Sequence, residues 1–345
     1  RVMAISIISI HLACASTNLL SGFGGENPSA WSLQLSYISW LTYILFVPGA
    51  LILLNRRKAP LSNQDIVLII PISLMWVMIM APSAQILWAI LSFSNPITWW
   101  NTSFLSLTLT MLLYFRYSLR ESRVLAFDVN WRKTPSLVFL SALVMLLISV
   151  LGPIQFNYNG DNTVSMVAIF LISILPTFFS ENSRIGDSVL LYSSSLALLL
   201  ITSLSSSNVS GLDIQTEYFF SDSVIQKQYI DIFSNFHYST VISTQGLVPL
   251  LSLWTGISLT ITLKVVYPII FSYCSILLYN SYGRIFNREV AYYSTLMTIF
   301  GVSFYTSMLD VVRQGFAEIF LLSAIFIMCS SDDIRMHRNR VFLVP

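Results

Sequence analysis

The chain has 345 residues, of which 55% are hydrophobic and only 10% charged, and its formal net charge at pH 7 is +2. Soluble domains carry about 25% charged residues, so this composition excludes a soluble globular protein, and the mean hydropathy of +0.73 indicates a membrane protein. Nucleic-acid binding is excluded as well, because the basic residues are too scattered to form a positive patch.

The cysteines indicate neither a redox nor a zinc function. Cys14, Cys274 and Cys329 all lie within apolar runs, where a cysteine packs as a small hydrophobic side chain. The chain begins with Arg1, and its first twenty residues are already apolar. We therefore expect a processed or incomplete polypeptide rather than one that opens on a signal peptide.

Ten segments are candidates for crossing a bilayer, which takes about 20 mostly apolar residues per helix. They are residues 2–20, 35–54, 66–91, 99–115, 135–151, 164–179, 188–204, 259–278, 290–307 and 311–329. The third contains Pro71 and Pro82, so it is either a kinked helix or a span followed by a re-entrant piece. We predict an all-α integral membrane protein with about ten transmembrane helices.

The distribution of Lys and Arg predicts the orientation, because short cytoplasmic loops retain positive charge. Ten crossings place 15 of the 18 basic residues on one side, and only Lys227, Lys264 and Arg313 fall elsewhere. We predict a plasma-membrane protein with both ends in the cytoplasm. The longest outer loop, residues 205–258, is rich in aromatic and aliphatic side chains, so we expect it to fold onto the membrane surface.

Two acids stand near the start of this loop. Asp213 and Glu217 are four residues apart, so a helix would place both carboxylates on one face, above the outer end of the seventh span. Such a pair could serve as a general base and as a ligand for a divalent cation or a substrate. The alternative is that Asp213 caps the helix and Glu217 is simply solvated.

The second half of the loop predicts another surface helix. Residues 241–254 mix aliphatic side chains with Ser, Thr and Gln, which is typical of a helix lying along the bilayer. His237 precedes this segment. A histidine at an interface is more often a polar filler than a catalyst, and we keep His237 only as a candidate substrate ligand.

The tenth span carries Asp310, Arg313, Gln314 and Glu318, which a continuous helix would align on one stripe. Charged residues in a span usually face a polar cavity and pair with one another. Arg313 therefore either bridges to Asp310 or Glu318, or faces an anion, for which a phosphate is the best candidate. Lys264, in the eighth span, either snorkels to the outer surface or joins Arg313 at that anion.

Two acids above two cations would suit a phosphorylated lipid whose sugar faces the acids. Other chemical signatures are absent from the sequence, which has no phosphate-binding loop, no Cys/His metal set and no nucleophile motif. A charge relay for ion transport needs acids in several spans, and the first six spans supply almost none.

The region from residue 211 to residue 329 resembles an uncharacterised archaeal family of large multi-pass membrane proteins. The resemblance covers roughly a third of the chain. It is carried by Gly211-Leu212-Asp213-Ile214 with Glu217-Tyr218, by Lys264-Val265-Val266-Tyr267-Pro268 with Phe271-Ser272 and Leu278-Tyr279, and by Arg313-Gln314 with Ala317-Glu318 and Phe320.

That family looks like the GT-C glycosyltransferases, polytopic enzymes that use polyprenyl-phosphate-linked sugars. The resemblance implies an N-terminal bundle of about six spans over residues 1–187 and a GT-C-like partial core over residues 188–345, with interfacial helices at 213–233 and 241–254. A GT-C core needs more helices than this chain supplies. The remainder then lies on a missing part or on another chain, or the protein is a non-catalytic relative.

The resemblance implies transfer of a sugar from a lipid-linked donor to an acceptor outside the cell. Asp213 would be the base or a ligand of Mg²⁺ or Mn²⁺, with Glu217 as its companion. Arg313, with Lys264, Gln314 and His237 as weaker candidates, would bind the donor phosphate. The chief alternative is a non-enzymatic membrane subunit, in which these residues bridge helices and lipids and the outer face docks further membrane subunits.

Overall fold

A computed structural model of the chain describes residues 30–56, 63–91, 95, 97–118, 136–178, 183–230 and 241–330. The regular structure of these residues is entirely helical, so the predicted all-α class is confirmed. The chain divides into two compact units, each built from two stretches of sequence. Unit 1 comprises Arg1–Asp128 and Glu217–Thr262, and unit 2 comprises Val129–Thr216 and Leu263–Pro345.

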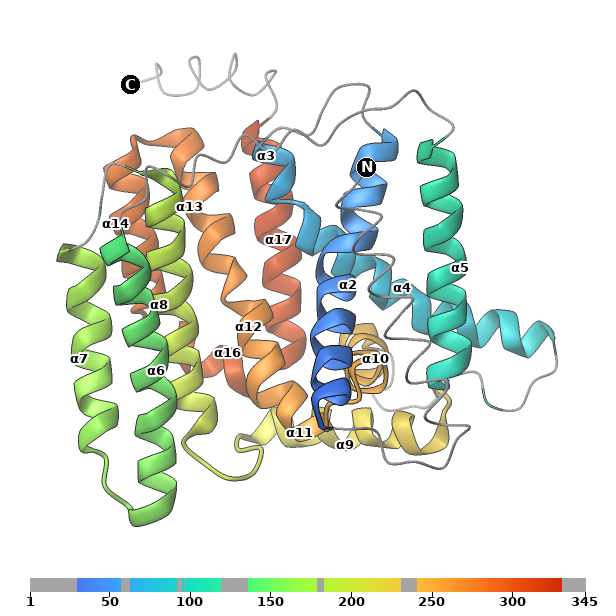
Figure 1. Ribbon diagram of the computed structural model, residues 1–345, viewed down its shortest axis with the longest axis horizontal. Coiled ribbons are helices and arrows are strands. Elements are labelled where there is room, and N and C mark those ends of the chain that lie inside the picture. The colour runs from blue at the N-terminus through green and yellow to red at the C-terminus, as the bar shows by residue number, and fades with distance from the viewer. Residues whose placement is uncertain are drawn as a thin grey trace, which may run out of the picture. The chain divides into compact units, whose positions relative to one another are not determined.

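Unit 1 is built around the packing of α2 on α4 and α5, with α10 packed against α2 and α5. Its described elements are α2 (Ala30–Arg56), α3 (Asn63–Ile66), α4 (Ile69–Ile90), α5 (Trp99–Ser118), the π-helix η3 (Ser243–Leu247), α10 (Val248–Thr255) and α11 (Leu259–Ile261) (Figure 1). Pro71 stands in the first turn of α4, where a missing N–H is tolerated, and Pro82 lies inside the helix. The third predicted span is therefore a single helix.

Hydrogen-bonded polar side chains tie the helices of unit 1 together. The Tyr43 hydroxyl on α2 bonds to the hydroxyls of Ser106 and Thr110 on α5, at 3.0 and 2.7 Å. Trp254 on α10 donates its indole N–H to Thr102 on α5 at 2.8 Å. Because these groups are buried, each bond satisfies a polar atom that hydrocarbon could not.

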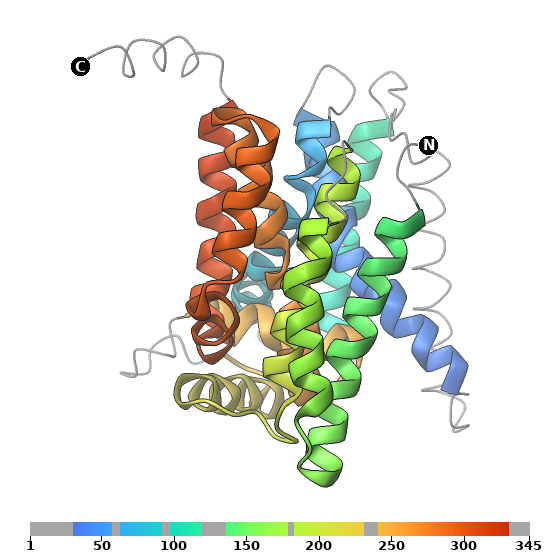
Figure 2. The same cartoon turned by 90° about the vertical axis from the view of Figure 1, so that its left-hand side faces the viewer.

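Unit 2 is a helical bundle in which α8 is central. Its elements include α6 (Ser136–Asn159), α7 (Thr163–Phe178), α8 (Arg184–Leu204), α12 (Tyr267–Phe271), α13 (Tyr273–Ile285), α14 (Arg288–Ile299), α15 (Val302–Tyr305), α16 (Ser307–Asp310) and α17 (Val312–Ser330). α8 packs against α6 and α7 and also against α12, α13 and α14, and α17 packs against α13 (Figures 1 and 2).

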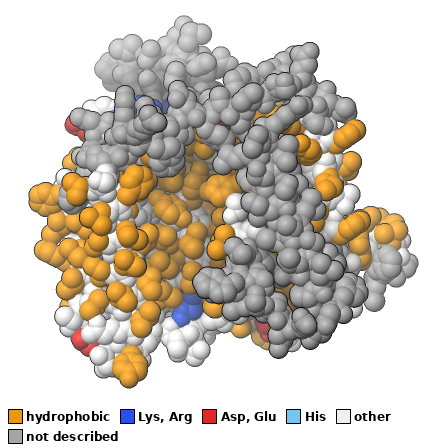
Figure 3. Space-filling model, in the orientation of Figure 1, with side chains coloured by type: hydrophobic (Ala, Val, Ile, Leu, Met, Phe, Trp, Pro, Cys, Tyr) orange, Lys and Arg blue, Asp and Glu red, His pale blue; other side chains and the backbone are white. Residues whose placement is uncertain are grey.

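The outer faces of α6 and α7 are apolar. Figure 3 shows hydrophobic side chains covering the part of the surface that these helices form. The exposed residues on α6 and α7 include Leu140, Leu143, Leu147, Leu151, Met166, Ile169 and Phe170. Contiguous apolar surface of this kind is rare on soluble proteins and is expected where a helix faces lipid.

Six helical stretches are long and apolar enough to cross a membrane. They are Tyr37–Asn55, Ile69–Ile90, Ser136–Asn159, Arg184–Leu204, Leu259–Ile285 and Val312–Ser330. A shorter apolar helix, Thr163–Phe178, covers the sixth predicted span, residues 164–179. Two more predicted spans are helical over α5 and over α14 and α15, and the first, residues 2–20, lies outside the described residues.

The long loop predicted outside the membrane contains helices in both places where the sequence predicts them. α9 (Leu212–Lys227) begins in unit 2, and its later residues belong to unit 1. The second helical segment is η3 followed by α10, and the prediction that it lies along the membrane surface is wrong: residues 243–252 are buried, and Trp254, 1% exposed, bonds to Thr102 within unit 1. Another π-helix, η4 (Thr262–Val266), connects α11 to α12.

Candidate functional site

The connection from α8 to α9, residues 205–211, ends at a glycine with a special conformation. Gly211 has a φ of +126°, which only glycine adopts readily. A Cβ atom added to it would lie 2.4 Å from the Oδ1 atom of Asp310, the last residue of α16. The missing side chain thus allows the Asp310 carboxylate to approach the connection closely.

Beyond this glycine, Asp213 in the first turn of α9 forms an ion pair with Arg313 in the first turn of α17. The distance from Arg313 Nη2 to Asp213 Oδ2 is 2.7 Å, and the two side chains are 29% and 39% exposed. Both residues belong to unit 2, although 100 positions separate them in the sequence. The structure brings together a candidate base and a candidate phosphate ligand that the sequence nominated separately.

The stripe expected from a continuous tenth span is interrupted. α16 ends at Asp310, Val311 adopts extended dihedrals (φ −134°, ψ 85°), and α17 begins at Val312. At the break, the Tyr267 hydroxyl on α12 donates to the Met308 carbonyl at 2.7 Å. In a continuous α-helix that carbonyl would accept from the N–H of Val312.

Tyr267 also packs against α17, the helix that carries Arg313. Its side chain is 1% exposed, and its ring stacks on Phe271 and contacts Phe316. A Cβ atom at Gly315 would lie 1.9 Å from the Tyr267 hydroxyl oxygen. Tyr267 therefore fixes the chain on both sides of the break at Val311.

Lys264 does not snorkel to solvent. It lies in η4, is 8% exposed, and donates its ammonium hydrogens to the carbonyl oxygens of Ser206 and Asn208, the latter at 3.4 Å. Its own carbonyl accepts a hydrogen bond from the Ser203 hydroxyl. A cation beside the end of α8 is favoured because the last carbonyls of a helix are unpaired and carry partial negative charge.

The other nominated residues are placed differently. Glu217, on the part of α9 that belongs to unit 1, is 1% exposed rather than solvated. Gln314 on α17 is exposed, Glu318 is half-buried, and His237 lies outside the described residues. Within the described ranges, no group of three or more His, Cys, Asp or Glu side chains gathers as a metal site would.

A second polar cluster, which the sequence analysis missed, lies near the start of α8. Asp187 is 1% exposed, and its Oδ2 atom accepts hydrogen bonds from Nε of Arg288 and from the Tyr279 hydroxyl, both at 2.8 Å. The same oxygen lies 2.7 Å from Nη2 of Arg288 in an ion pair. Burial alone would lower the pKa of Arg288, but the contact with Asp187 holds it above its ordinary value. About 16 residues of helix, roughly 24 Å, separate Asp187 from Ser203.

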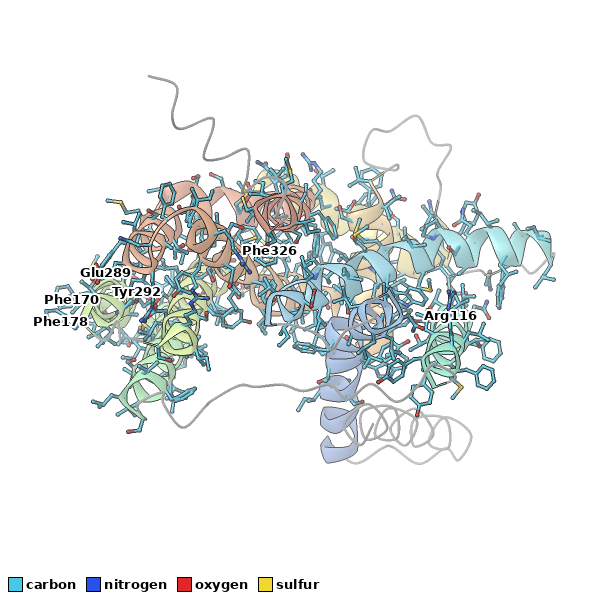
Figure 4. The ribbon with its side chains drawn as sticks, turned by 90° about the horizontal axis from the view of Figure 1, so that it is seen from above. Arg116, Phe170, Phe178, Glu289, Tyr292 and Phe326 are labelled. Atoms are coloured by element: carbon cyan, nitrogen blue, oxygen red, sulfur yellow. The ribbon has the colours of Figure 1, made fainter. Side chains whose placement is uncertain are left out.

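Tyr292 on α14 adds to the packing at this end, since its hydroxyl donates to the Pro176 carbonyl of α7 at 2.7 Å (Figure 4). The sequence held one signal for the cluster: an acid in the first turn of an apolar helix usually has a buried partner. Starting the seventh span at Ser188 placed Asp187 outside it. α8 in fact begins at Arg184.

The candidate site is therefore one end of unit 2, where Asp213, Arg313, Asp310 and Lys264 surround the connection between α8 and α9. It combines two acids and two cations drawn from four elements. Comparisons with protein-family models, with curated proteins and with solved structures find no match to this chain.

Proposed function

We propose that the protein is a membrane glycosyltransferase that moves a sugar from a polyprenyl-phosphate-linked donor to an acceptor outside the cell. The observation that supports this best is the pair formed by Asp213 and Arg313 at 2.7 Å. Glycosyl transfer needs a carboxylate to take the proton of the acceptor and a cation to neutralise the departing phosphate. Here the two groups stand side by side.

In the proposed reaction, the acceptor oxygen bonds to the anomeric carbon of the sugar while the bond from that carbon to the donor phosphate breaks. The acceptor proton passes to Asp213, and the negative charge that develops on the lipid phosphate is neutralised by Arg313, whose planar fork matches a phosphate. Lys264 adds a second positive charge. Gln314 and His237 remain candidate ligands of the substrate.

A divalent cation, Mg²⁺ or Mn²⁺, is part of the proposal. Mg²⁺ is usually held by one or two carboxylates together with substrate phosphates. The contact of Asp213 with Arg313 uses Oδ2, which leaves Oδ1 for a cation or an acceptor. We propose Asp213 as a protein ligand, and the cation would strengthen the binding of the donor phosphate.

We further propose ten membrane crossings, in the plasma membrane, with both ends cytoplasmic. Crossings only at the six long apolar helices would divide the 18 Lys and Arg residues 11 to 7 between the two sides. Ten crossings place 15 of the 18 on one side. Because short cytoplasmic loops retain basic residues, the ten-span topology, with the GT-C-like core beginning at α8, is the better supported.

A non-enzymatic membrane subunit is the second candidate, and one observation favours it. The protein's own oxygens contact both cations of the site, since Arg313 pairs with Asp213 and Lys264 binds loop carbonyls. Structural bridges between helices would have the same form.

The test is sugar transfer by the purified protein, reconstituted in liposomes with polyprenyl-phosphate-linked hexoses. Asp213→Asn keeps the shape of the side chain and removes its basicity, so transfer should fall about 10²- to 10⁴-fold. Asp222→Asn is the matched control, because Asp222 is an acid on the same helix that bonds to Gln226 one turn away. A folded Asp213→Asn protein with full transfer would refute the base, and a wild type inert with every donor would favour the subunit.

A further inference from the structure

The connection between α8 and α9 is held at two points by cations from other elements. Lys264 binds the carbonyls of Ser206 and Asn208, and two residues beyond Gly211 the carboxylate of Asp213 is bound by Arg313. We name residues 205–211 the strap. Lys264 and Arg313, the cations that the proposed function assigns to a phosphate, are thus in contact with oxygen atoms of the strap and of Asp213, two residues beyond it.

Lys264 is a buried cation that carbonyl oxygens, rather than a carboxylate, surround. It is 8% exposed, and within the described residues it takes part in no ion pair. Burying an ammonium group without a counter-charge is unfavourable, because carbonyl dipoles replace only part of its hydration. An anion that reached Lys264 would supply the missing counter-charge, so this environment itself points to an anionic ligand.

The second attachment is easily exchanged. The pair of Asp213 and Arg313 is partly exposed on both sides, and pairs of that kind contribute about 0–1 kcal/mol. A phosphate group carries up to two charges and accepts the two parallel N–H groups of a guanidinium. A phosphate can therefore replace the carboxylate of Asp213 at little cost.

Gly211 provides the strap with a pivot. Its φ of +126° and its lack of a side chain let the backbone rotate there more freely than at any other residue type. Asp310 lies against this pivot, and its negative charge repels an incoming anion. An anion must therefore overcome Asp310, and removal of that charge should tighten its binding.

We propose that a phosphate group binds Lys264 and Arg313 in place of the strap and Asp213, which releases the strap and frees the Asp213 carboxylate when the donor arrives. The device keeps the base paired until a phosphate is present. The inference rests on the proposed function for the role of Asp213 as the base and for the lipid that carries the phosphate.

Hydrogen–deuterium exchange of the strap tests the proposal. The wild-type protein is placed in phosphatidylcholine nanodiscs with polyprenyl phosphate, with neutral polyprenol or with inorganic pyrophosphate. Polyprenyl phosphate should speed exchange by up to about 10- to 100-fold at those amides of residues 205–211 that are protected only while Lys264 holds the strap, because bonds to a charged group are worth about 1.5–3 kcal/mol. Polyprenol should have no effect. If only pyrophosphate speeds exchange, release of the strap by an anion would be supported, and the proposal that the phosphate belongs to a lipid would be overturned.

Variants of Lys264 and a control at Lys227 distinguish release of the strap from a general effect of removing positive charge. In Lys264→Gln the strap should exchange rapidly even without an anion, and addition of an anion should cause no further change. Lys264→Arg should keep the response to polyprenyl phosphate, and it replaces the glutamine variant in the test if that variant does not fold. Lys227→Gln, which removes an exposed charge at the end of α9, should behave as wild type. Asp310→Asn should lower the half-saturating concentration of polyprenyl phosphate.

Three results would overturn the proposal: unchanged exchange in the wild type, an equal response to polyprenol, or loss of the response in Lys227→Gln. The outcome is separable from that of the proposed function. Release of the strap without sugar transfer would refute the glycosyltransferase and leave the phosphate-operated strap in place.

Discussion

Gly315 lies in the first turns of α17, directly against the hydroxyl of Tyr267. Gly315→Ala would place a methyl group 1.9 Å from that oxygen, and we expect a loss of about 1–3 kcal/mol in the free energy of unfolding. Gly283→Ala on α13 is the matched control, since nothing lies within 4 Å of its added Cβ. An alanine there should stabilise by about 0.4–1 kcal/mol. Thermal unfolding in detergent distinguishes the two, and equal effects would contradict the close contact.

The pair of Asp187 and Arg288 is asymmetric, because the acid is buried and the arginine side chain is 27% exposed. Arg288→Gln leaves an unpaired buried carboxylate and should cost about 3 kcal/mol or more. Asp187→Asn should cost less, since it keeps an acceptor for Tyr279 and leaves an arginine that can reach water. The double variant should cost less than the sum of the two. Equal costs in thermal unfolding would argue against this asymmetry.

Single residues of the site were predictable from the energetic cost of burying charge, but their partners were not. Arg313 and Lys264 are recognisable as cations within apolar runs, and Asp213 as an acid just outside one. The pairing of Asp213 with Arg313 joins residues 100 positions apart and depends on the helix break at Val311. At that break Tyr267 makes a tertiary hydrogen bond to the Met308 carbonyl, which no local pattern reveals.

At the scale of elements, long apolar runs predicted the helices well, because their length and composition alone favour helix in a membrane. The interruptions were harder to predict. The π-helical turn at Lys264 and the short helices α15 and α16 are set by contacts with distant residues, such as the bond of the Ser203 hydroxyl to the Lys264 carbonyl. The spacing of apolar residues carries no trace of them.

The turn between α6 and α7 is organised by a carboxylate that titrates outside the membrane spans. Asp161 accepts hydrogen bonds from the amide and hydroxyl of Thr163 and from the Gln155 side chain, and those from Thr163 lower its pKa below the ordinary 3.8. Since the folded pKa lies below the unfolded one, the stabilisation is fully present above about pH 4 and is lost as the pH falls through the folded value.

We therefore expect exchange of the Thr163 amide to become less protected below about pH 4 in the wild type, after correction for the intrinsic rate. Asp161→Asn has no charge to lose and should show a protection factor independent of pH over this range. Ser173→Ala, which removes a hydroxyl from the middle of α7, is a control that should titrate as wild type. A wild-type protection factor that stays constant to pH 2 would contradict the role of Asp161.

For the whole molecule, the proposed function depends on which side of the membrane the candidate site occupies. The strap contains no Lys or Arg, whereas Arg284 and Arg288 flank the turn between α13 and α14. This difference predicts the strap outside and the turn inside. One candidate span, Leu259–Ile285, lies between the two positions, so they lie on opposite sides with either six or ten crossings. The ten-crossing topology predicts that the strap is on the outer side, because it places 15 of the 18 basic residues on the side of the turn.

Cysteines introduced at Ser207 and at Glu289 test this, since both side chains are exposed and both belong to unit 2. In intact cells an impermeant maleimide should label the cysteine at 207 and not the one at 289, and permeabilised cells should label both. The unsubstituted protein is the control for the three native cysteines, Cys14, Cys274 and Cys329. Labelling of 289 alone would reverse the orientation and place Asp213 and Arg313 in the cytoplasm, where an acceptor outside the cell could not reach them. Labelling of both in intact cells would mean that Leu259–Ile285 does not cross the membrane.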